Sequence, residues 1–552
     1  MDIDYQILFS LESLKVDERE CTELDITEFV KLIPRKLAIQ YGLAIANYSQ
    51  DDDINVQLNS LQFNSETKRF VEFILASKEF NEKYILFKPQ TGLEILKYTF
   101  SIPKEAFISG STTFFPLLIS IIIINSLLLS NDAHLKDNSI TRSSKIIRSK
   151  SYELDERVPI FATVFRMCCL LHFLEQNCEN QWTYLRDYLI KDISHETLRD
   201  YFKCVLELLN RLTIGPKNKF QILKVKEDNP ILRNLIDPLS VSTDEVIRLE
   251  DNRDYTFFKK HPFIQLAPNN YGVISNLFVA NQLYSSLKFR MSKISMENKI
   301  FKNFLSSFNK DFVENYLLNE VLGNAFGGKR DTLHLNENEC VNRIKEYNKT
   351  HKCKISIEGL PDAYIRSNNK ILLIECKGKT ISLDAIENEA KFFNNVNNDI
   401  VSKNKGTGQL ISYCNKVKKG EFVCDKGIPS EFVIYPFLIV DDPKLGIDGL
   451  NRYAIQCTEE YVQTNRKWVY PVTVLDLDTL ILISDLIKKG EFDIFEQIEQ
   501  YHMYIAGEAE KYSLNETLNY SDISFASYIL DKFETRSPAI INQWLEGLYS
   551  IK

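Results

Sequence analysis

The spacing of hydrophobic residues changes along the chain and separates helical parts from strand-bearing parts. Between residues 157 and 215, apolar side chains recur every three or four positions, which predicts amphipathic helices. A second amphipathic run begins near Ser295 and stops at the pair Gly327-Gly328, which is typical of a helix end. From about residue 475 onward the pattern is helical again, so the flanks of the chain are predicted to be mainly α-helical.

Short strands interrupt the helical pattern in the C-terminal half. Runs rich in β-branched and aromatic residues predict strands at CKISI, AYIRS, ILLIECK and FVIYPFLIV. Two helical stretches, 383–397 and 408–418, separate the last two of these strands. The alternation predicts an α/β domain. The predicted division is an N-terminal α/β or helical domain at 1–130, a polar linker or loop at 131–156, a mainly helical region at 157–294, the α/β domain at 295–470 and a helical segment at 471–552.

One stretch, from Phe114 to Leu129, is almost wholly apolar. It is shorter than the roughly 20 apolar residues that a membrane-spanning helix needs, and it contains Pro116 and Asn125. We therefore expect a buried core helix or a pair of strands, and no membrane association.

Composition and charge narrow the classes of function. The chain has 552 residues, 44% of them hydrophobic and 26% charged, which indicates a globular protein of several domains. The net charge of −8 does not by itself indicate nucleic-acid binding, but such a sum can conceal a local basic patch. The 11 cysteines include no CxxC pair, which argues against a disulfide framework or a zinc-finger-like site. With acidic residues at the start of the sequence, this favours a cytoplasmic location.

The clearest chemistry lies in and just before the run ILLIECK. Pro361-Asp362 closes one segment, and Glu375-Cys376-Lys377 ends the next. Alternate residues of a strand share a face, so Glu375 and Lys377 point one way and Cys376 points the other. Charged side chains on such an apolar strand are costly unless they are paired or bind a metal.

The intervening segment AYIRSNNK has a Ser-Asn-Asn turn that can close a hairpin and bring Asp362 beside Glu375. Two clustered carboxylates suit a hard divalent cation such as Mg²⁺. Lys377, one pleat away, can orient a water or stabilise charge developing on a phosphate. These are the groups needed to hydrolyse a phosphodiester. The alternatives are an exposed Glu375–Lys377 ion pair and a turn-forming role for Asp362.

The order PD followed by ECK resembles the signature of the PD-(D/E)xK nuclease superfamily. The resemblance covers a minor part of the chain. It implies a mixed sheet flanked by helices and Mg²⁺-dependent cleavage of nucleic acid, with Mn²⁺ as the alternative metal and DNA favoured over RNA.

Two further features of that family have counterparts here. A helix before the sheet commonly carries a glutamate; Glu314 matches it, and Glu320 is the competitor. In the RecB-like branch a later helix carries QxxxY, and Gln409 and Tyr413 have this spacing and share a helical face. The alternatives are a solvated helix glutamate at 314 and a core tyrosine at 413. The resemblance implies a metal site of Asp362, Glu375 and Glu314 and a catalytic set completed by Lys377, Gln409 and Tyr413.

Local charge supports a nucleic-acid substrate. Residues 340–421 contain 15 Lys and Arg against 9 Asp and Glu, in a chain that is acidic as a whole. Lysines flank the predicted Gln409 helix, where they can meet phosphates or form only a solvated face. The candidates for nucleic-acid binding are Lys403, Lys405, Lys416, Lys418 and Lys419.

A near match to a phosphate-binding P-loop runs from Gly323 to Arg330. Arg330 stands where the motif needs Ser or Thr, and a helix precedes it instead of a strand, so nucleotide binding is not expected. The sequence therefore predicts a metal-dependent nuclease. Its layout, a large helical region joined to a nuclease core, is analogous to bacterial proteins of defence against foreign DNA, with an N-terminal region that binds a protein partner or a second copy. The alternative is a catalytically inactive nuclease fold that binds nucleic acid or serves as an assembly subunit.

Overall fold

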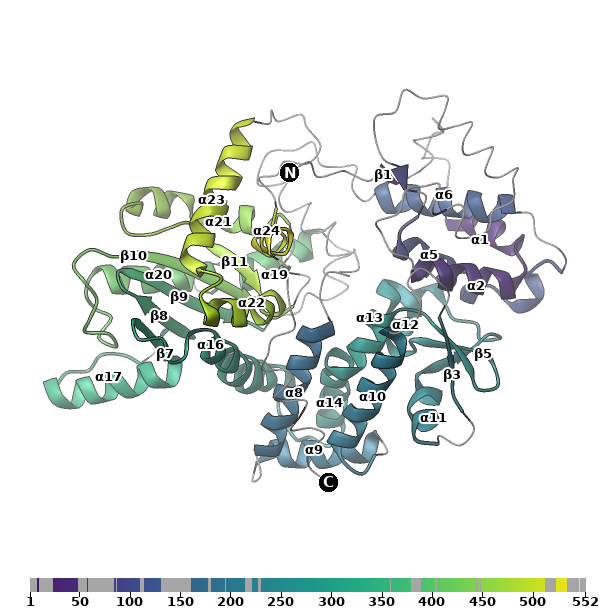
Figure 1. Cartoon of the computed structure of the whole chain (residues 1–552), viewed down its shortest axis with the longest axis horizontal. Coiled ribbons are helices and arrows are strands. Elements are labelled where there is room, and N and C mark those ends of the chain that lie inside the picture. The colour runs from purple at the N-terminus through teal and green to yellow at the C-terminus, as the bar shows by residue number, and fades with distance from the viewer. Residues whose placement is uncertain are drawn as a thin grey trace. The chain divides into compact units, whose positions relative to one another are not determined.

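The chain forms two compact units, and each unit combines two separate stretches of sequence. Unit 1 comprises Met1–Ala133 and Thr197–Lys288, and unit 2 comprises His134–Glu196 and Phe289–Lys552. The computed structural model (Figure 1) describes residues 7–8, 23–47, 57, 84–85, 87–109, 114–130, 160–176, 180–193, 195–213, 221–226, 230–357, 359–378, 389–402, 405–442, 445–446, 448–511, 523–533 and 546. The predicted linker at 131–156 lies outside these residues, and the division into five segments stays a prediction.

Unit 2 is built on a five-stranded mixed sheet in the order β11-β10-β9-β8-β7. Its strands are β7 (Thr332–Asn336), β8 (Ala363–Ser367), β9 (Lys370–Lys377), β10 (Val433–Val440) and β11 (Thr473–Asp476). β7, β8 and β9 are joined antiparallel, whereas β9, β10 and β11 run parallel. The prediction of combined helix and sheet in the C-terminal half is confirmed.

The strands β8 and β9 form the predicted hairpin, with Ser367 opposite Lys370. Asn368 in the turn has a φ of 52°, in the left-handed region that asparagine tolerates better than most residues. The prediction of a strand at 353–357 is wrong. There the side chain of Asn348 donates to the Ile355 carbonyl at 2.9 Å and accepts from the Ile355 N–H at 2.8 Å, so a helix side chain replaces a strand partner.

Helices cover both faces of this sheet (Figure 1). On one face, Leu410 and Cys414 of α20 share a buried core with Leu373 of β9 and Leu438 of β10. The helices of unit 2 are α8 (Ile160–Gln176), α9 (Gln181–Asp192), α15 (Phe304–Ser307), a π-helix (Phe308–Leu317), α16 (Leu318–Phe326), α17 (Glu337–His351), α19 (Glu389–Asp399), α20 (Thr407–Lys418), α21 (Leu450–Asn465), α22 (Leu477–Lys489), α23 (Ile494–Lys511) and α24 (Phe525–Lys532). On the opposite face, Tyr435 and Phe437 of β10 contact rings of α23 and α24.

A buried arginine ties α8 to the ends of two parallel strands. Arg166 is 3% exposed, and its guanidinium donates to the carboxylates of Asp441 and Asp478. Asp441 directly follows β10, and Asp478 lies in the first turn of α22, just after β11. The Asp441 N–H also donates to the Lys377 carbonyl at 3.0 Å. The arginine therefore fixes the backbone directly beside the ECK strand.

Unit 1 contains a four-stranded sheet in the order β3-β6-β5-β4 and a group of helices. The strands are β3 (Ile222–Lys224), β4 (Ser240–Ser242), β5 (Phe263–Ala267) and β6 (Asn270–Val273), with a separate parallel pair of β1 (Ile7–Leu8) and β2 (Tyr84–Ile85). The helices are α1 (Glu23–Lys31), α2 (Arg35–Ala46), α5 (Pro89–Ser101), α6 (Phe114–Ser130), α10 (Leu198–Thr213), α11 (Pro230–Ile236), α12 (Thr256–Lys260) and α13 (Asn276–Ala280). Helix α14 (Ser285–Glu297) contains the boundary between the units.

The apolar stretch at 114–129 forms α6, and its described side chains, such as Leu118 and Ile121, lie in the core of unit 1. This confirms the helical form of the prediction. Among the described residues, no helix combines the length and hydrophobicity needed to span a membrane.

We expect Arg166→Met to destabilise unit 2 by about 3–5 kcal/mol, because it leaves Asp441 and Asp478 buried without their shared counter-charge. All three tryptophans of the chain belong to unit 2, so urea unfolding followed by tryptophan fluorescence measures this unit alone. Arg186→Met is the matched control: Arg186 pairs with Asp187, whose side chain is 55% exposed, and its loss should cost under about 1 kcal/mol. Equal losses in the two variants would contradict the prediction.

Candidate active site

The hairpin of β8 and β9 places the two carboxylates of the motif side by side. The register pairs Ala363 with Ile374, so Asp362 lies next to Glu375 at the same end of the sheet. Oδ2 of Asp362 accepts a hydrogen bond from the Cys376 N–H at 2.6 Å. This bond uses one carboxylate oxygen of Asp362, a residue that is largely enclosed by protein but keeps part of its surface accessible.

Glu375 is the most enclosed member of the site, with 3% of its surface exposed. Its Oε1 accepts from Nζ of Lys377 at 2.5 Å, and its Oε2 accepts from the Tyr413 hydroxyl at 3.0 Å. Cys376 between them is fully buried and lies on the opposite face of β9. The Lys377 side chain is only 15% exposed. The ion pair of Glu375 and Lys377 therefore differs from the solvent-exposed pair considered as an alternative in the sequence analysis.

Helix α20 extends this contact into a chain of hydrogen bonds. The Gly406 N–H donates to Oε1 of Gln409 at 3.0 Å, and Nε2 of Gln409 donates to the Tyr413 hydroxyl at 3.3 Å. Tyr413 in turn donates to Glu375. Tyr413 is 2% exposed and packs in the core, but its hydroxyl also holds the site carboxylate, so the core role and the site role coexist. The structure thus brings Gln409 and Tyr413 to the strand residues.

Glu314 approaches the same carboxylates from the π-helix Phe308–Leu317. The wider π turn is marked by the Leu318 N–H, which donates to the carbonyl five residues earlier, at Val313. Gly378, directly after β9, allows this approach: a Cβ at Gly378 would lie 2.7 Å from Cβ of Asn309 in the π-helix. Such π segments are uncommon and are often found at functional sites.

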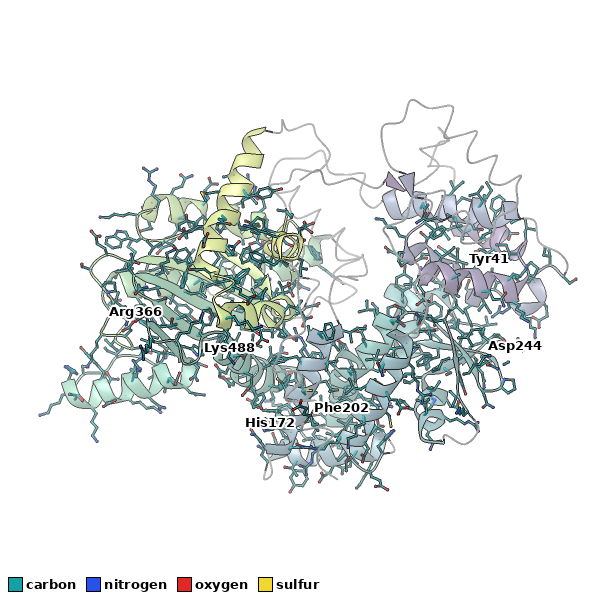
Figure 2. The ribbon with its side chains drawn as sticks, viewed as in Figure 1. Tyr41, His172, Phe202, Asp244, Arg366 and Lys488 are labelled. Atoms are coloured by element: carbon teal, nitrogen blue, oxygen red, sulfur yellow. The ribbon has the colours of Figure 1, made fainter. Side chains whose placement is uncertain are left out.

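Glu320, the alternative to Glu314 in the sequence analysis, lies in a different environment. Burial raises the pKa of Glu320, and the nearby charge of His172 in α8 works against that rise. The preceding π-helix places the Tyr316 hydroxyl against Nδ1 of His172, labelled in Figure 2. Glu314, in contrast, interacts electrostatically with Asp362 and Lys377. Of the two glutamates, Glu314 is the one that lies with the motif residues.

The site holds more negative than positive charge. Burial and the neighbouring Glu375 raise the pKa of Asp362 well above its usual range. Burial raises the pKa of Glu375, although Lys377 and Tyr413 oppose the rise. Burial alone would lower the pKa of Lys377, but the surrounding carboxylates outweigh it and raise that pKa. Burial and then Asp362 raise the pKa of Glu314 to about 7. Three carboxylates thus share one ammonium group.

This donor set fits a hard divalent cation in its chemistry. It supplies three carboxyl groups against one ammonium group, and carboxylate oxygens are the ligands that Mg²⁺ and Mn²⁺ prefer. Asp362, Glu375 and Glu314 are the residues that would hold the ion. When bound, such an ion lowers the pKa of a coordinated water and offsets negative charge on a phosphate. Within the described residues, however, no group of three His, Cys, Asp or Glu side chains is arranged to hold a metal ion.

The chain's own groups can perform the remaining tasks of phosphodiester hydrolysis. Lys377 is a fixed positive donor that can orient a water or stabilise charge on the phosphate. Tyr413 fixes the rotamer of Glu375, and Gln409 in turn orients the tyrosine hydroxyl.

The candidate lysines lie in several environments. Nζ of Lys416 donates to the Gly359 carbonyl at 2.9 Å, and Lys418 donates to the side chain of Asn465. Lys405 forms an ion pair of 3.3 Å with Asp399, and Lys419 is exposed. Lys403 lies outside the described residues. Their contact with nucleic acid stays a prediction.

Three residues near the site were not predicted from the sequence. Glu337, the first residue of α17, contributes negative charge that raises the pKa of Asp362 and Glu314. Asn309 of the π-helix lies against Gly378. A glycine directly after ECK could have indicated that another segment approaches the backbone closely at this point. Arg166 acts through Asp441 and gave no sequence signal, because 275 residues separate this pair.

Comparisons with family models, with curated proteins and with solved structures find no match for this chain. The resemblance to PD-(D/E)xK nucleases consequently depends on the motif residues and their arrangement.

The raised pKa of Glu314 predicts a dependence of stability on pH. Because the folded value of about 7 exceeds the ordinary 4.5, this group stabilises the fold fully below about pH 4.5 and loses that contribution as the pH rises through about 7. Glu314→Gln should therefore gain stability relative to the parent between pH 5 and pH 8, by at most about 3 kcal/mol.

Urea unfolding at both pH values, in EDTA and followed by tryptophan fluorescence, measures this difference. Glu346→Gln, on an exposed position of α17, is the matched control for the loss of a helix glutamate. A relative stability of Glu314→Gln that is the same at pH 5 and pH 8 would refute the raised pKa.

Proposed function

We propose that this protein is a metal-dependent nuclease of the PD-(D/E)xK type, which uses Mg²⁺ or Mn²⁺ to hydrolyse phosphodiester bonds of nucleic acid, with DNA favoured over RNA. Asp362, Glu375 and Glu314 bind the metal, and Lys377 assists the attack of water. A cytoplasmic role in bacterial defence against foreign DNA, with a protein partner or second copy bound through the N-terminal region, belongs to the same proposal.

One observation carries the proposal. The Tyr413 hydroxyl donates to Glu375, while Lys377 pairs with the other oxygen of the same carboxylate. Glu375 and Tyr413 are 38 residues apart in sequence, so the motifs ExK and QxxxY meet at a single side chain. Two short motifs that occurred by chance would have no physical reason to contact each other at one side chain. The mixed sheet, with an antiparallel hairpin beside parallel strands, supports the same reading.

A second candidate function has its own support. Both oxygens of Glu375 are already engaged by protein donors, and no metal-ready group of three ligands occurs in the described parts of the chain. A nuclease-like fold that binds nucleic acid without cutting it, or that serves as an assembly subunit, would have these properties. Isothermal titration with Mn²⁺ separates the candidates: binding that Asp362→Asn abolishes supports the nuclease, and no binding to the parent supports the subunit.

Lys377→Met should separate chemistry from binding. Loss of this single charged donor is expected to slow cleavage about 10²–10³-fold, while binding of nucleic acid and of metal persists. The measurement is the single-turnover cleavage rate at saturating Mg²⁺ on linear, circular and single-stranded substrates. Asp362→Asn and Glu375→Gln should each abolish cleavage in the same assay, because each removes a metal ligand.

Cys376→Ala is the matched control, since it lies one residue away on the opposite face of β9. It should lower stability through lost packing but leave the rate within a few-fold of the parent. A slow Cys376 variant beside a fast Lys377 variant would mean that the site has been assigned to the wrong face of the strand.

Tyr413→Phe removes the hydrogen bond to Glu375 and the bond that the hydroxyl accepts from Gln409, but it keeps the ring in the core. We expect cleavage to slow about tenfold, in line with the loss of a bond to a charged group. The pKa of Glu375 should rise, since Tyr413 lowers it, so the acidic limb of the pH–rate profile should move to higher pH. Tyr461→Phe, which removes a hydroxyl bonded to Asn415 at 3.0 Å, is the control and should leave the profile unchanged. An unshifted profile in Tyr413→Phe would argue that the hydroxyl serves packing alone.

A further inference from the structure

A second charged feature of unit 2 lies at the far end of α17. The C-terminal half of this helix, the segment that follows it, the last turn of α20 and the loop around Cys424 form one surface, termed here the α17 surface. Its cationic residues are Arg343, Lys345, Lys349, Lys352, Lys354, Lys416, Lys419 and Lys426. Seven of them are exposed and Lys416 is half-buried.

Side-chain contacts join these segments. Nη1 of Arg343 donates to the Cys424 carbonyl at 2.9 Å, and Nζ of Lys426 lies 5.4 Å from the centre of the Tyr347 ring. Lys416 donates to the Gly359 carbonyl. Figure 1 shows α17 running outward from the sheet beside β7, and Figure 2 shows side chains projecting from the length of this helix. The positive charges therefore share one region although three separate stretches of sequence supply them.

Among the residues that the structure describes, cations outnumber acidic groups on these segments. The described acidic residues on the same segments are Glu346 and Glu421, both exposed, while Asp425 is bound by Arg366 and Tyr364. Among the described residues, none of the seven exposed cations forms an ion pair. Such clustering is unfavourable for an isolated protein and favours a partner with dense negative charge.

The helix dipole accounts for only part of this pattern. Cations in the last turn of a helix are stabilised by its negative end, which explains Lys349 and His351 of α17. Lys416 lies in the last turn of α20 and is explained in the same way. Lys354 and Lys426 lie outside any helix and gain nothing comparable. They need another explanation.

The same helix connects this surface to the candidate active site. The Glu337 N–H at the start of α17 donates to the Asp362 carbonyl at 3.2 Å. The helix has 15 residues, which corresponds to a length of about 22 Å. Successive phosphates of a DNA strand are about 3.4 Å apart along the axis, so the cations reach phosphates about six steps from the carboxylates.

We propose that the α17 surface binds the phosphate backbone of a nucleic-acid duplex on one side of the cleaved bond. This inference rests on the proposed function for the identity of the ligand and adds the surface that holds it. Lysine side chains dominate, and they act as point charges that contact phosphates without reading bases. The surface therefore sets affinity and the minimum substrate length, and it leaves sequence preference to other contacts.

The test is binding without cleavage. Fluorescence anisotropy in EDTA measures the Kd of the full chain for a 20-base-pair and an 8-base-pair duplex over a series of salt concentrations. The variant Lys349→Ala/Lys354→Ala/Lys426→Ala removes one cation from each of three segments. For the 20-base-pair duplex, the slope of log Kd against log salt should fall by about two to three, at roughly 0.9 per lost phosphate contact. The loss should be smaller for the 8-base-pair duplex.

The matched control is Lys293→Ala/Lys302→Ala/Lys489→Ala, which removes three exposed lysines elsewhere on unit 2 and should leave the slope unchanged. An unchanged slope in the α17 variant, or an equal fall in the control, overturns the inference. The proposed function is tested separately by adding Mg²⁺. If the α17 variant binds DNA more weakly but the parent does not cleave DNA, the inference about the α17 surface stands and the proposal of a nuclease is rejected.

Discussion

Burial of charge at one end of the unit 2 sheet is the constraint on which the rest of this structure depends. β9, β10 and β11 run parallel, so their carboxyl ends meet along one edge. Glu375, Asp441 and Asp478 all lie at or just beyond these ends and are nearly inaccessible to water. A buried carboxylate is tolerated only with donors close by. Lys377 supplies them for the first, and Arg166 supplies them for the other two.

This arrangement explains why a helix distant in sequence belongs to the same unit as the strands. Helix α8 carries the counter-charge for two strand ends, and the Asp441 N–H is bonded in turn to the Lys377 carbonyl. The position of Lys377 is thus fixed from both sides, by Glu375 within its own strand and by Arg166 through the neighbouring one. Precision of this kind suits the role that the proposed function assigns to Lys377.

The features that could be predicted from the sequence are those determined by residues close to one another along the chain. The β8–β9 hairpin follows from its turn residues and apolar alternation, and the facing of Glu375 and Lys377 follows from strand geometry alone. The inclusion of Gln409 and Tyr413 in the candidate site was predicted only through a family resemblance, and their contact with Glu375 was not predicted, since spacing shows a shared helix face but not what that face meets. The segment at 353–357 was misjudged because the side chain of Asn348 competes for its backbone groups, an interaction that no propensity reflects.

The way the two units share the chain has a consequence for biosynthesis. The ribosome releases α8 long before β10 and α22, so Arg166 emerges without either of its aspartate partners. An unpaired guanidinium resists burial, so α8 cannot complete its packing until synthesis has passed Asp478. Unit 1 is likewise finished only after its second stretch, which follows α9 in the chain. The two units therefore cannot fold one after the other as they leave the ribosome. For the same reason, no single cut in the polypeptide yields two fragments that each contain one complete unit.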